Sequence, residues 1–289
     1  MTSDIQAPPA SETSTLTSSK KPLFDFGSNE TGDLNGAIIA RDLDANTAVR
    51  IDHRIGGDES GNPLTVVIGD SGSGKTMLAM IMAYQFDALG VAGAYINPQF
   101  RSTEEMDSLA RHLSSGWKFL APPQLPLDDG DAARWMSVNV RSQYERLASN
   151  GGGVLLIEEA QAIVGDSEKS EFDWLCRSAQ AANILPVLFG DHARDFASHP
   201  ATISGSPSRR ITLRQRPGPD AREALSYLGL ENPSVSHEAL LTDSGFRNSP
   251  EMPSSGFMRH VNGSISRVMF GPLDQTFIEL VSPKRWTGN

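Results

Sequence analysis

Residues 69–76 read Gly-Asp-Ser-Gly-Ser-Gly-Lys-Thr, which is the complete phosphate-loop pattern G-x-x-x-x-G-K-[ST]. The apolar segment 64–68 precedes this loop, and the apolar, helix-forming stretch 75–89 follows it. A strand, a glycine-rich turn and a helix in this order form an anion site, because the helix directs its positive end and its free N–H groups at the ligand. The feature therefore predicts a nucleotide-binding α/β fold.

The residues of this loop have distinct expected roles. The glycines let backbone N–H groups turn towards the β- and γ-phosphates, and Lys75 reaches these phosphates as a point charge. The hydroxyl of Thr76 is expected to bind Mg²⁺. The alternative is a flexible Gly/Ser loop that binds nothing. We predict contacts to ATP or GTP from Gly69, Asp70, Ser71, Gly72, Ser73, Gly74, Lys75, Thr76 and Met77.

Strands and helices alternate along the rest of the folded region. Short apolar runs predict strands at 91–96, 117–120, 154–157 and 184–189. Helical patterns cover 75–89, 103–113, 131–148 and 170–181, and Gly90 is expected to end the first of them. This alternation predicts a mostly parallel sheet with helices on both faces. Such sheets bind ligands at the carboxyl ends of their strands, where the phosphate loop lies.

A second motif places two acids at the end of an apolar strand. Residues 154–157 are Val-Leu-Leu-Ile, and Glu158 and Glu159 follow directly. In nucleotide hydrolysis one acid at such a position holds the metal and the next activates the attacking water. We assign Glu158 to Mg²⁺ and Glu159 to the role of catalytic base. The alternative is a buried strand that ends in a solvated, charged loop.

Composition narrows the class of protein further. A net charge of −10 repels nucleic acid and acidic membranes in bulk, although a few basic loops can still contact DNA. The single cysteine, Cys176, excludes an internal disulfide and suits a reducing compartment. No apolar run approaches the roughly 18 residues of a membrane span, and no signal peptide is expected at the start. These features predict a cytoplasmic protein without a membrane span.

The chain divides into an expected tail and one ATPase-sized domain. Residues 1–22 are rich in Ser, Thr and Pro and predict a disordered tail, whereas folded sequence is expected from 23 to 289. We expect a core at about 36–215 and a small strand-rich carboxyl-terminal extension at about 216–289. Within the extension a helix is expected to begin at Asp220. Asn262-Gly263 predicts a hairpin, which is expected to form a sheet edge, with the alternative that it faces a partner.

Several segments together resemble a known family. They are similar to elements of the HerA–FtsK branch of ring ATPases. The segments are the expected strand pair 36–43 and 49–52, the segment 93–98, and the stretches 174–189 and 255–260. More narrowly, they resemble the motor domain of conjugative type IV secretion ATPases. The resemblance implies a RecA-like sheet, ATP rather than GTP, and Mg²⁺ as cofactor.

Three positions depart from the pattern of that family. Glu158 and Asn97 each replace an aspartate, and Gly190-Asp191 replaces a phosphate-sensing motif that ends in glutamine. A carboxylate at Asp191 cannot donate the N–H that a glutamine offers to a γ-phosphate. Asp191 therefore either has another role in the nucleotide site, or hydrolysis is slow.

The resemblance also implies an assembly and a task. It implies a homo-oligomeric ring, a hexamer, with ATP at the junctions and an arginine supplied by the neighbouring subunit. Arg209 and Arg210 are the catalytic candidates for that arginine, with Arg214 next, and the alternative is that they are solvated charges at a strand edge. The task would be DNA translocation or conjugation-type secretion, with DNA or secretion components as partners and recruitment to the inner face of the membrane.

Two other functions are consistent with the same motifs. A regulatory switch would bind ATP with little turnover, because Glu158 and Asp191 are altered. A transposition-type AAA+ ATPase has a similar phosphate loop and acidic motif, but it usually ends in a helical lid, whereas segments 257–270 and 276–281 read as strands.

Trp135 and Tyr144 on one helix are expected to be core residues rather than a base-stacking platform, and His192 and His199 lack the spacing of metal ligands.

Overall fold

The computed structural model describes residues 30–32, 36–54, 63–99, 104–122, 127–164, 171–197, 209–242, 254–270 and 277. The predicted tail 1–22 lies outside these residues, and so does His199. Of the predicted strand 276–281 only Phe277 is described.

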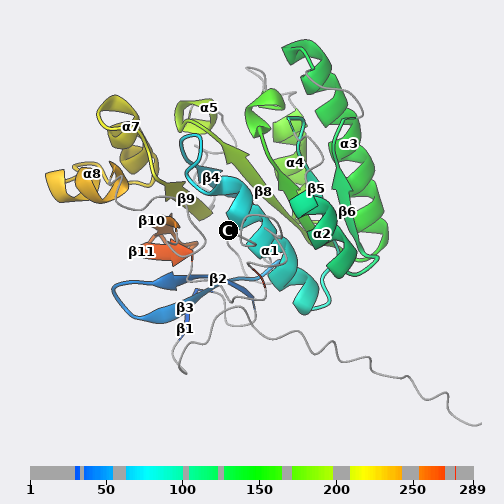
Figure 1. Cartoon of the computed structure of the whole chain (residues 1–289), viewed down its shortest axis with the longest axis horizontal. Coiled ribbons are helices and arrows are strands. Elements are labelled where there is room, and N and C mark those ends of the chain that lie inside the picture. Colours follow the sequence, from blue (N-terminus) through cyan, green and yellow to red (C-terminus); the bar gives the residue numbers. More distant parts are fainter. Residues whose placement is uncertain are drawn as a thin grey trace, which may run out of the picture.

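Eleven strands form one sheet, in the order β1-β3-β2-β11-β10-β9-β4-β8-β7-β5-β6 (Figure 1). The strands from β9 to β6 in this order run parallel. The pairs β9–β10, β10–β11, β11–β2 and β2–β3 are antiparallel, and β1 pairs parallel with β3. The bounds are β1 Glu30–Gly32, β2 Ala37–Asp42, β3 Thr47–Ile51, β4 Thr65–Ile68, β5 Gly93–Ile96, β6 Trp117–Leu120, β7 Gly153–Ile157, β8 Ile184–Gly190, β9 Arg209–Leu213, β10 Ser254–Arg259 and β11 Ile265–Phe270.

Helices cover both faces of this sheet, as predicted. One face carries α1 and α2, and the other carries α3, α4, α5, α7 and α8. The bounds are α1 Lys75–Ala88, α2 Glu104–His112, α3 Asp129–Ser149, the short 3₁₀ helix η1 Ala160–Ala162, α4 Glu171–Ala179, α5 Arg194–Ala197, α7 Pro219–Tyr227 and α8 Val235–Thr242. Among the described residues, no helix is both long and apolar enough to cross a bilayer.

The central strands are apolar on both faces because both faces are covered. In β7, Val154 and Leu156 belong to the core under α1, whereas Leu155 and Ile157 belong to the core under α3 and α4. All four side chains are fully buried. Successive side chains of a strand point to opposite faces, so a continuous apolar run indicates a strand inside a sheet covered on both sides. The phosphate loop likewise follows a fully buried strand, β4, inside this sheet.

The predicted hairpin exists, but it does not form a sheet edge. Gly263 has a φ of 83° in the turn, and β10 and β11 pair antiparallel on either side of it. β10 also pairs with β9, and β11 pairs with β2, so the hairpin joins the parallel strands to the β2–β3 pair. Phe257 and Met258 of β10 are buried in opposite faces of the sheet, which only an interior strand allows.

The region after β9 is partly helical and belongs to the same domain. Helices α7 and α8 pack against each other and beside β9 and β10, and their buried side chains join the core that also holds α3 and α4. Within residues 209–242 and 254–270 these helices are part of the sheet's cover, not a helical lid of their own. Trp135 and Tyr144 are partly buried against the same core, as predicted.

Candidate functional site

The loop between β4 and α1 has the conformation of a phosphate cradle. Gly72 and Gly74 have φ angles of 70° and 101°, which residues with a Cβ rarely adopt. Gly74 occupies the N-cap position of α1 and has no side chain to cap the helix, and the first turn contains no acidic residue. The N–H groups of this turn and the positive end of the helix therefore remain to stabilise an anion.

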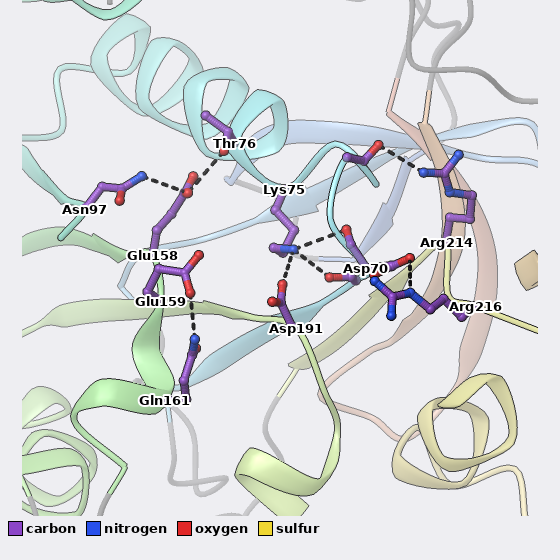
Figure 2. A network of polar contacts seen from close by, with 12 residues as sticks. Asp70, Lys75, Thr76, Asn97, Glu158, Glu159, Gln161, Asp191, Arg214 and Arg216 are labelled. Atoms are coloured by element: carbon purple, nitrogen blue, oxygen red, sulfur yellow. Dashed lines mark hydrogen bonds and ion pairs between the residues drawn. The ribbon is translucent and has the colours of Figure 1, made fainter. Parts of the chain in front are cut away.

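Lys75 is held by three oxygen atoms at the carboxyl end of the sheet (Figure 2). Its Nζ donates to the carbonyl oxygen of Gly69 at 2.5 Å, to that of Asp70 at 3.3 Å, and to Oδ1 of Asp191 at 2.7 Å. An ammonium has three N–H donors, so these acceptors use all of them. A phosphate that binds Lys75 must therefore displace at least one of the three oxygens.

Glu158 follows β7 and faces the first turn of α1. It is 5% exposed, and its Oε2 accepts a hydrogen bond from the hydroxyl of Thr76 at 3.1 Å. Two residues of the neighbouring β5 end also donate to it: Tyr95 to Oε1 at 2.8 Å and Asn97 to Oε2 at 2.9 Å. Burial raises the pKa of Glu158, and the hydrogen bonds from Tyr95 and Thr76 oppose that rise. The same burial and the nearby Glu158 charge raise the pKa of Tyr95 well above its usual value.

Glu159 lies on the side of the site that faces Asp191. Its backbone is left-handed, with a φ of 51°, which is uncommon for a residue with a side chain and turns the chain directly after β7. Oε2 of Glu159 accepts a hydrogen bond from the amide of Gln161 at 2.6 Å. Burial raises the pKa of Glu159; Gln161 works against the rise and the charge of Asp191 adds to it. A carboxylate with a raised pKa is a stronger base than an exposed one.

The opposite flank of the loop is basic and comes from the end of β9. Arg216 donates from Nε to Oδ2 of Asp70 at 3.0 Å, and Arg214 donates to the carbonyl oxygen of Gly72 at 3.3 Å. The hydroxyl of Ser254, at the start of β10, donates to the carbonyl oxygen of Ser73 at 2.9 Å. Although burial works to raise the pKa of Asp70, the hydrogen bonds and the charge of Arg216 hold it below its usual value. Figure 2 places these arginines on the side of Lys75 away from Glu158.

Arg209 and Arg210 do not lie at this site. They begin β9 and pair in register with Thr65 and Val66 of β4, so they lie at the amino end of the strand, away from the loop. Arg209 is 2% exposed, and Arg210 lies over the ring of Tyr227, 4.7 Å from its centre, and donates to that residue's carbonyl oxygen. Neither is a solvated charge at a sheet edge, because β9 pairs on both sides. Arg209 is thus buried and Arg210 only partly exposed, and their role towards a neighbouring subunit stays a prediction.

The oxygen set fits a magnesium ion. Thr76 and Glu158 bring a hydroxyl and a carboxylate oxygen to 3.1 Å from one another, and hard oxygen ligands of this kind suit Mg²⁺. Among the described residues, no group of three or more His, Cys, Asp and Glu side chains could enclose a metal ion. Mg²⁺ is usually bound by one or two protein ligands together with substrate phosphates and water, and Thr76 and Glu158 supply two oxygens of that kind.

Four residues of the site lie outside the sequence-based predictions. Tyr95 contacts Glu158 and Gln161 contacts Glu159, whereas Arg216 and Ser254 contact the loop. Tyr95 lies in an apolar run that predicts core alone, and Ser254 reaches the loop only through the pairing of β10 with β9. Gln161, two residues after Glu159, is the one whose spacing could have indicated its contact.

No protein-family model matches the sequence, and no curated protein matches it. Several solved structures do share its fold. The structure of VirB4 of Thermoanaerobacter pseudethanolicus matches with a TM-score of 0.62 at 12% identity, covering 87% of this chain and 100% of that chain. The cytoplasmic domain of the Thermomonospora curvata type VII secretion ATPase EccC matches with a TM-score of 0.51 at 13% identity, covering 83% of this chain and 26% of that one.

The DNA-packaging ATPase B204 from Sulfolobus Turreted Icosahedral Virus has a TM-score of 0.49 at 16% identity, covering 75% of this chain and 100% of that chain. At these identities the similarity concerns the fold. The predicted RecA-like α/β sheet is confirmed, and the predicted resemblance is supported as a likeness of fold to VirB4 and EccC.

Proposed function

We propose that this chain binds and hydrolyses ATP as a motor of the HerA–FtsK type. One observation carries the proposal: the lysine and threonine of a phosphate loop lie beside two glutamates that directly follow β7, a parallel strand separated from β4 by β8. Thr76 contacts Glu158 directly. Burial raises the pKa of both glutamates, and Lys75 lies close enough for its charge to oppose that rise. The similarity of the fold to secretion ATPases supports the same class of function.

Binding of the triphosphate would be the task of the loop and of Lys75. The N–H groups between Gly72 and Met77 would surround the β- and γ-phosphates, and Lys75 would exchange one of its three oxygen partners for phosphate. The carboxylate of Asp191 is the partner to be displaced, because the two carbonyl oxygens belong to the loop itself. Met77 contributes to this cradle through its backbone N–H in the first turn of α1.

Turnover would depend on the acids after β7. Thr76 and Glu158 would hold Mg²⁺, which neutralises charge on the phosphates when it is bound. Glu159 would accept the proton of the attacking water, and Gln161 would hold that carboxylate in place until then. Burial keeps this site at low dielectric, where each of these charges acts more strongly.

The assembly we propose is a homo-oligomeric ring, a hexamer, with ATP at the junctions. The predicted arginine from a neighbouring subunit stays a prediction. Arg209 and Arg210 would have to leave their interior contacts to serve in this way, whereas Arg214 already lies beside the loop. The work driven by hydrolysis would be transfer of DNA or of a secretion substrate, with DNA or secretion components as partners in the cytoplasm or at the inner face of the membrane.

The test is steady-state ATP hydrolysis over a series of protein concentrations, with and without DNA. We expect specific activity to rise with concentration, because neighbouring subunits complete the site, and we expect DNA to stimulate it. In Lys75→Ala we expect nucleotide binding or turnover to be lost. Unchanged affinity and turnover in Lys75→Ala would contradict the assignment of the site.

A regulatory switch is the second candidate, and the Lys75–Asp191 pair is the observation that favours it. In this ion pair the carboxylate of Asp191 occupies Lys75, so a nucleotide phosphate must compete with Asp191 for the lysine. Tight ATP binding with a flat, near-zero rate at every protein concentration would select the switch over the motor. The AAA+ reading is less favoured, because α7 and α8 cover the main sheet.

A further inference from the structure

The end of β5 contacts both carboxylate oxygens of Glu158. The hydroxyl of Tyr95 lies 2.8 Å from Oε1, and Nδ2 of Asn97 lies 2.9 Å from Oε2. Tyr95 is 1% exposed and Asn97 is 5% exposed, so water does not compete for these contacts. No role in catalysis has been assigned to either residue so far, although both touch the acid that would hold the metal.

The directions of these hydrogen bonds are determined by the backbone. Oδ1 of Asn97 accepts the N–H of Gln99 at 2.9 Å, so its Nδ2 must face Glu158 and the Tyr95 hydroxyl. The Tyr95 oxygen accepts from Asn97 at 3.2 Å and donates its own proton to Glu158. With Thr76 included, every neighbour donates and Glu158 only accepts, which is the role of a carboxylate.

A glutamate needs such support more than an aspartate does. Its additional methylene adds a rotatable bond, so its carboxylate would otherwise sample more positions. Tyr95 and Asn97 hold both oxygens, and Oε2 is thereby kept facing the Thr76 hydroxyl. Hydrogen bonds that orient a metal ligand in this way typically affect metal affinity by about 10- to 100-fold.

We propose that Tyr95 and Asn97 are positioning residues that hold Glu158 ready for the magnesium ion of a bound nucleotide. The inference rests on the proposed function of the site. It explains why an amide suits position 97: an aspartate there could still accept the Gln99 N–H but would turn a second carboxylate oxygen towards Glu158. The two like charges would repel and move Glu158 away from Thr76.

The experiment measures how much Mg²⁺ tightens nucleotide binding. Affinity for a fluorescent, non-hydrolysable ATP analogue is titrated in excess Mg²⁺ and in EDTA, and the ratio of the two dissociation constants is compared between variants. We expect Asn97→Asp to reduce this ratio about tenfold and Tyr95→Phe about threefold, with affinity in EDTA within twofold of wild type. The matched control is Tyr144→Phe, which removes a hydroxyl that donates to the carbonyl oxygen of Ser178 in another part of the fold.

A double-mutant cycle separates positioning from a structural effect. In Glu158→Asp the acid is shorter, so Tyr95→Phe should cause no further reduction of the ratio. An equal effect of Tyr95→Phe in both backgrounds, or ratios like wild type in Asn97→Asp and Tyr95→Phe, would overturn the inference while the proposed function stands. A wild-type protein that binds no nucleotide would overturn the proposed function and this inference together.

Discussion

The two flanks of the phosphate loop differ in charge, in burial and in the strands that supply them. On one side, Glu158 and Glu159 follow β7 and Asp191 follows β8, and burial raises the pKa of both glutamates. On the other side, the segment after β9 supplies Arg214 and Arg216, and the Arg216 side chain is 67% exposed. Lys75 lies between the two flanks (Figure 2).

This difference in burial and charge indicates that the two flanks have different roles. Buried acids act at low dielectric, where they can hold a metal and take a proton, and removal of either function stops a chemical step. Exposed arginines act through water, where a single ion pair contributes at most about 1 kcal/mol. Substitutions in the acidic flank should therefore change the hydrolysis rate or the competition between Asp191 and phosphate for Lys75. Substitutions in the basic flank should change nucleotide affinity only slightly.

The largest effect is expected from Glu159→Gln. The amide cannot accept the proton of water as a carboxylate does, so the hydrolysis rate should fall by about 10²- to 10⁴-fold. ATP affinity should change less than threefold, because Lys75 and the loop remain, and filter binding of labelled ATP would reveal a trapped nucleotide. Glu145→Gln, an exposed change on α3, serves as the control. A rate within a factor of three of wild type would remove Glu159 from the role of base and favour the switch.

Gly69→Ala tests how tightly the loop is packed against β9. A Cβ at Gly69 would lie 2.3 Å from the Ser73 hydroxyl oxygen and 2.9 Å from the Cβ of Leu213, so the loop or the strand must shift. Crowding of this kind costs about 1–3 kcal/mol of unfolding free energy. Urea denaturation measures it, with Gly130→Ala at the exposed start of α3 as a control that should be neutral or stabilising. Equal stability of Gly69→Ala and wild type would show that the flank is looser than described.

Asp191→Asn is expected to tighten nucleotide binding. The change removes the carboxylate that pairs with Lys75 and would otherwise repel phosphate, so affinity in EDTA should rise about tenfold, equivalent to about 1.4 kcal/mol. Isothermal titration with ATP measures this, and Asp195→Asn in α5 makes the same change of net charge without contact to Lys75. Weaker binding in Asp191→Asn would mean that the carboxylate assists the nucleotide instead of competing with it.

The smallest effect is expected from Arg216→Ala. Its ion pair with Asp70 is largely exposed, so the unfolding free energy should change by less than about 1 kcal/mol and ATP affinity by about twofold. Thermal unfolding and the same titration measure both quantities. Arg134→Ala breaks a comparable exposed pair with Asp131 on α3 and is the matched control. A loss of turnover in Arg216→Ala as large as that in Glu159→Gln would contradict the idea that only the acidic flank acts in hydrolysis.

Local patterns were sufficient for the elements that carry the site. The apolar run before Glu158 predicts a strand, and β7 ends at Ile157 as expected. The helix after the phosphate loop ends near Gly90, which has a φ of 75°. These predictions succeed because they depend on periodicity, on glycine and on spacing within about twenty residues.

Predictions that depended on which strands are neighbours in the sheet were less successful than those based on local patterns. The β10–β11 hairpin is read correctly from Asn262-Gly263, but its interior position depends on pairing with β9 and β2, which lie far away in the sequence. Arg209 and Arg210 are predicted to serve a neighbouring subunit, with solvated charges at a strand edge as the alternative. The register of β9 with β4 places them at the amino end of an interior strand, so the strand-edge alternative is wrong, whereas their role towards a neighbouring subunit stays a prediction. Register between distant segments is a tertiary property, and a motif does not encode it.

By itself the sequence determined the phosphate loop, the two glutamates and the α/β class, because each follows from residue types at short spacing. Only the tertiary structure decided which side chains surround them. Asp191 reaches Lys75 across 116 positions of the chain and Tyr95 reaches Glu158 across 63, because parallel strands bring their carboxyl ends to one edge of the sheet. The residues that carry the expected chemistry are thus recognisable from short sequence motifs, whereas the side chains that contact them are determined by the order of the strands.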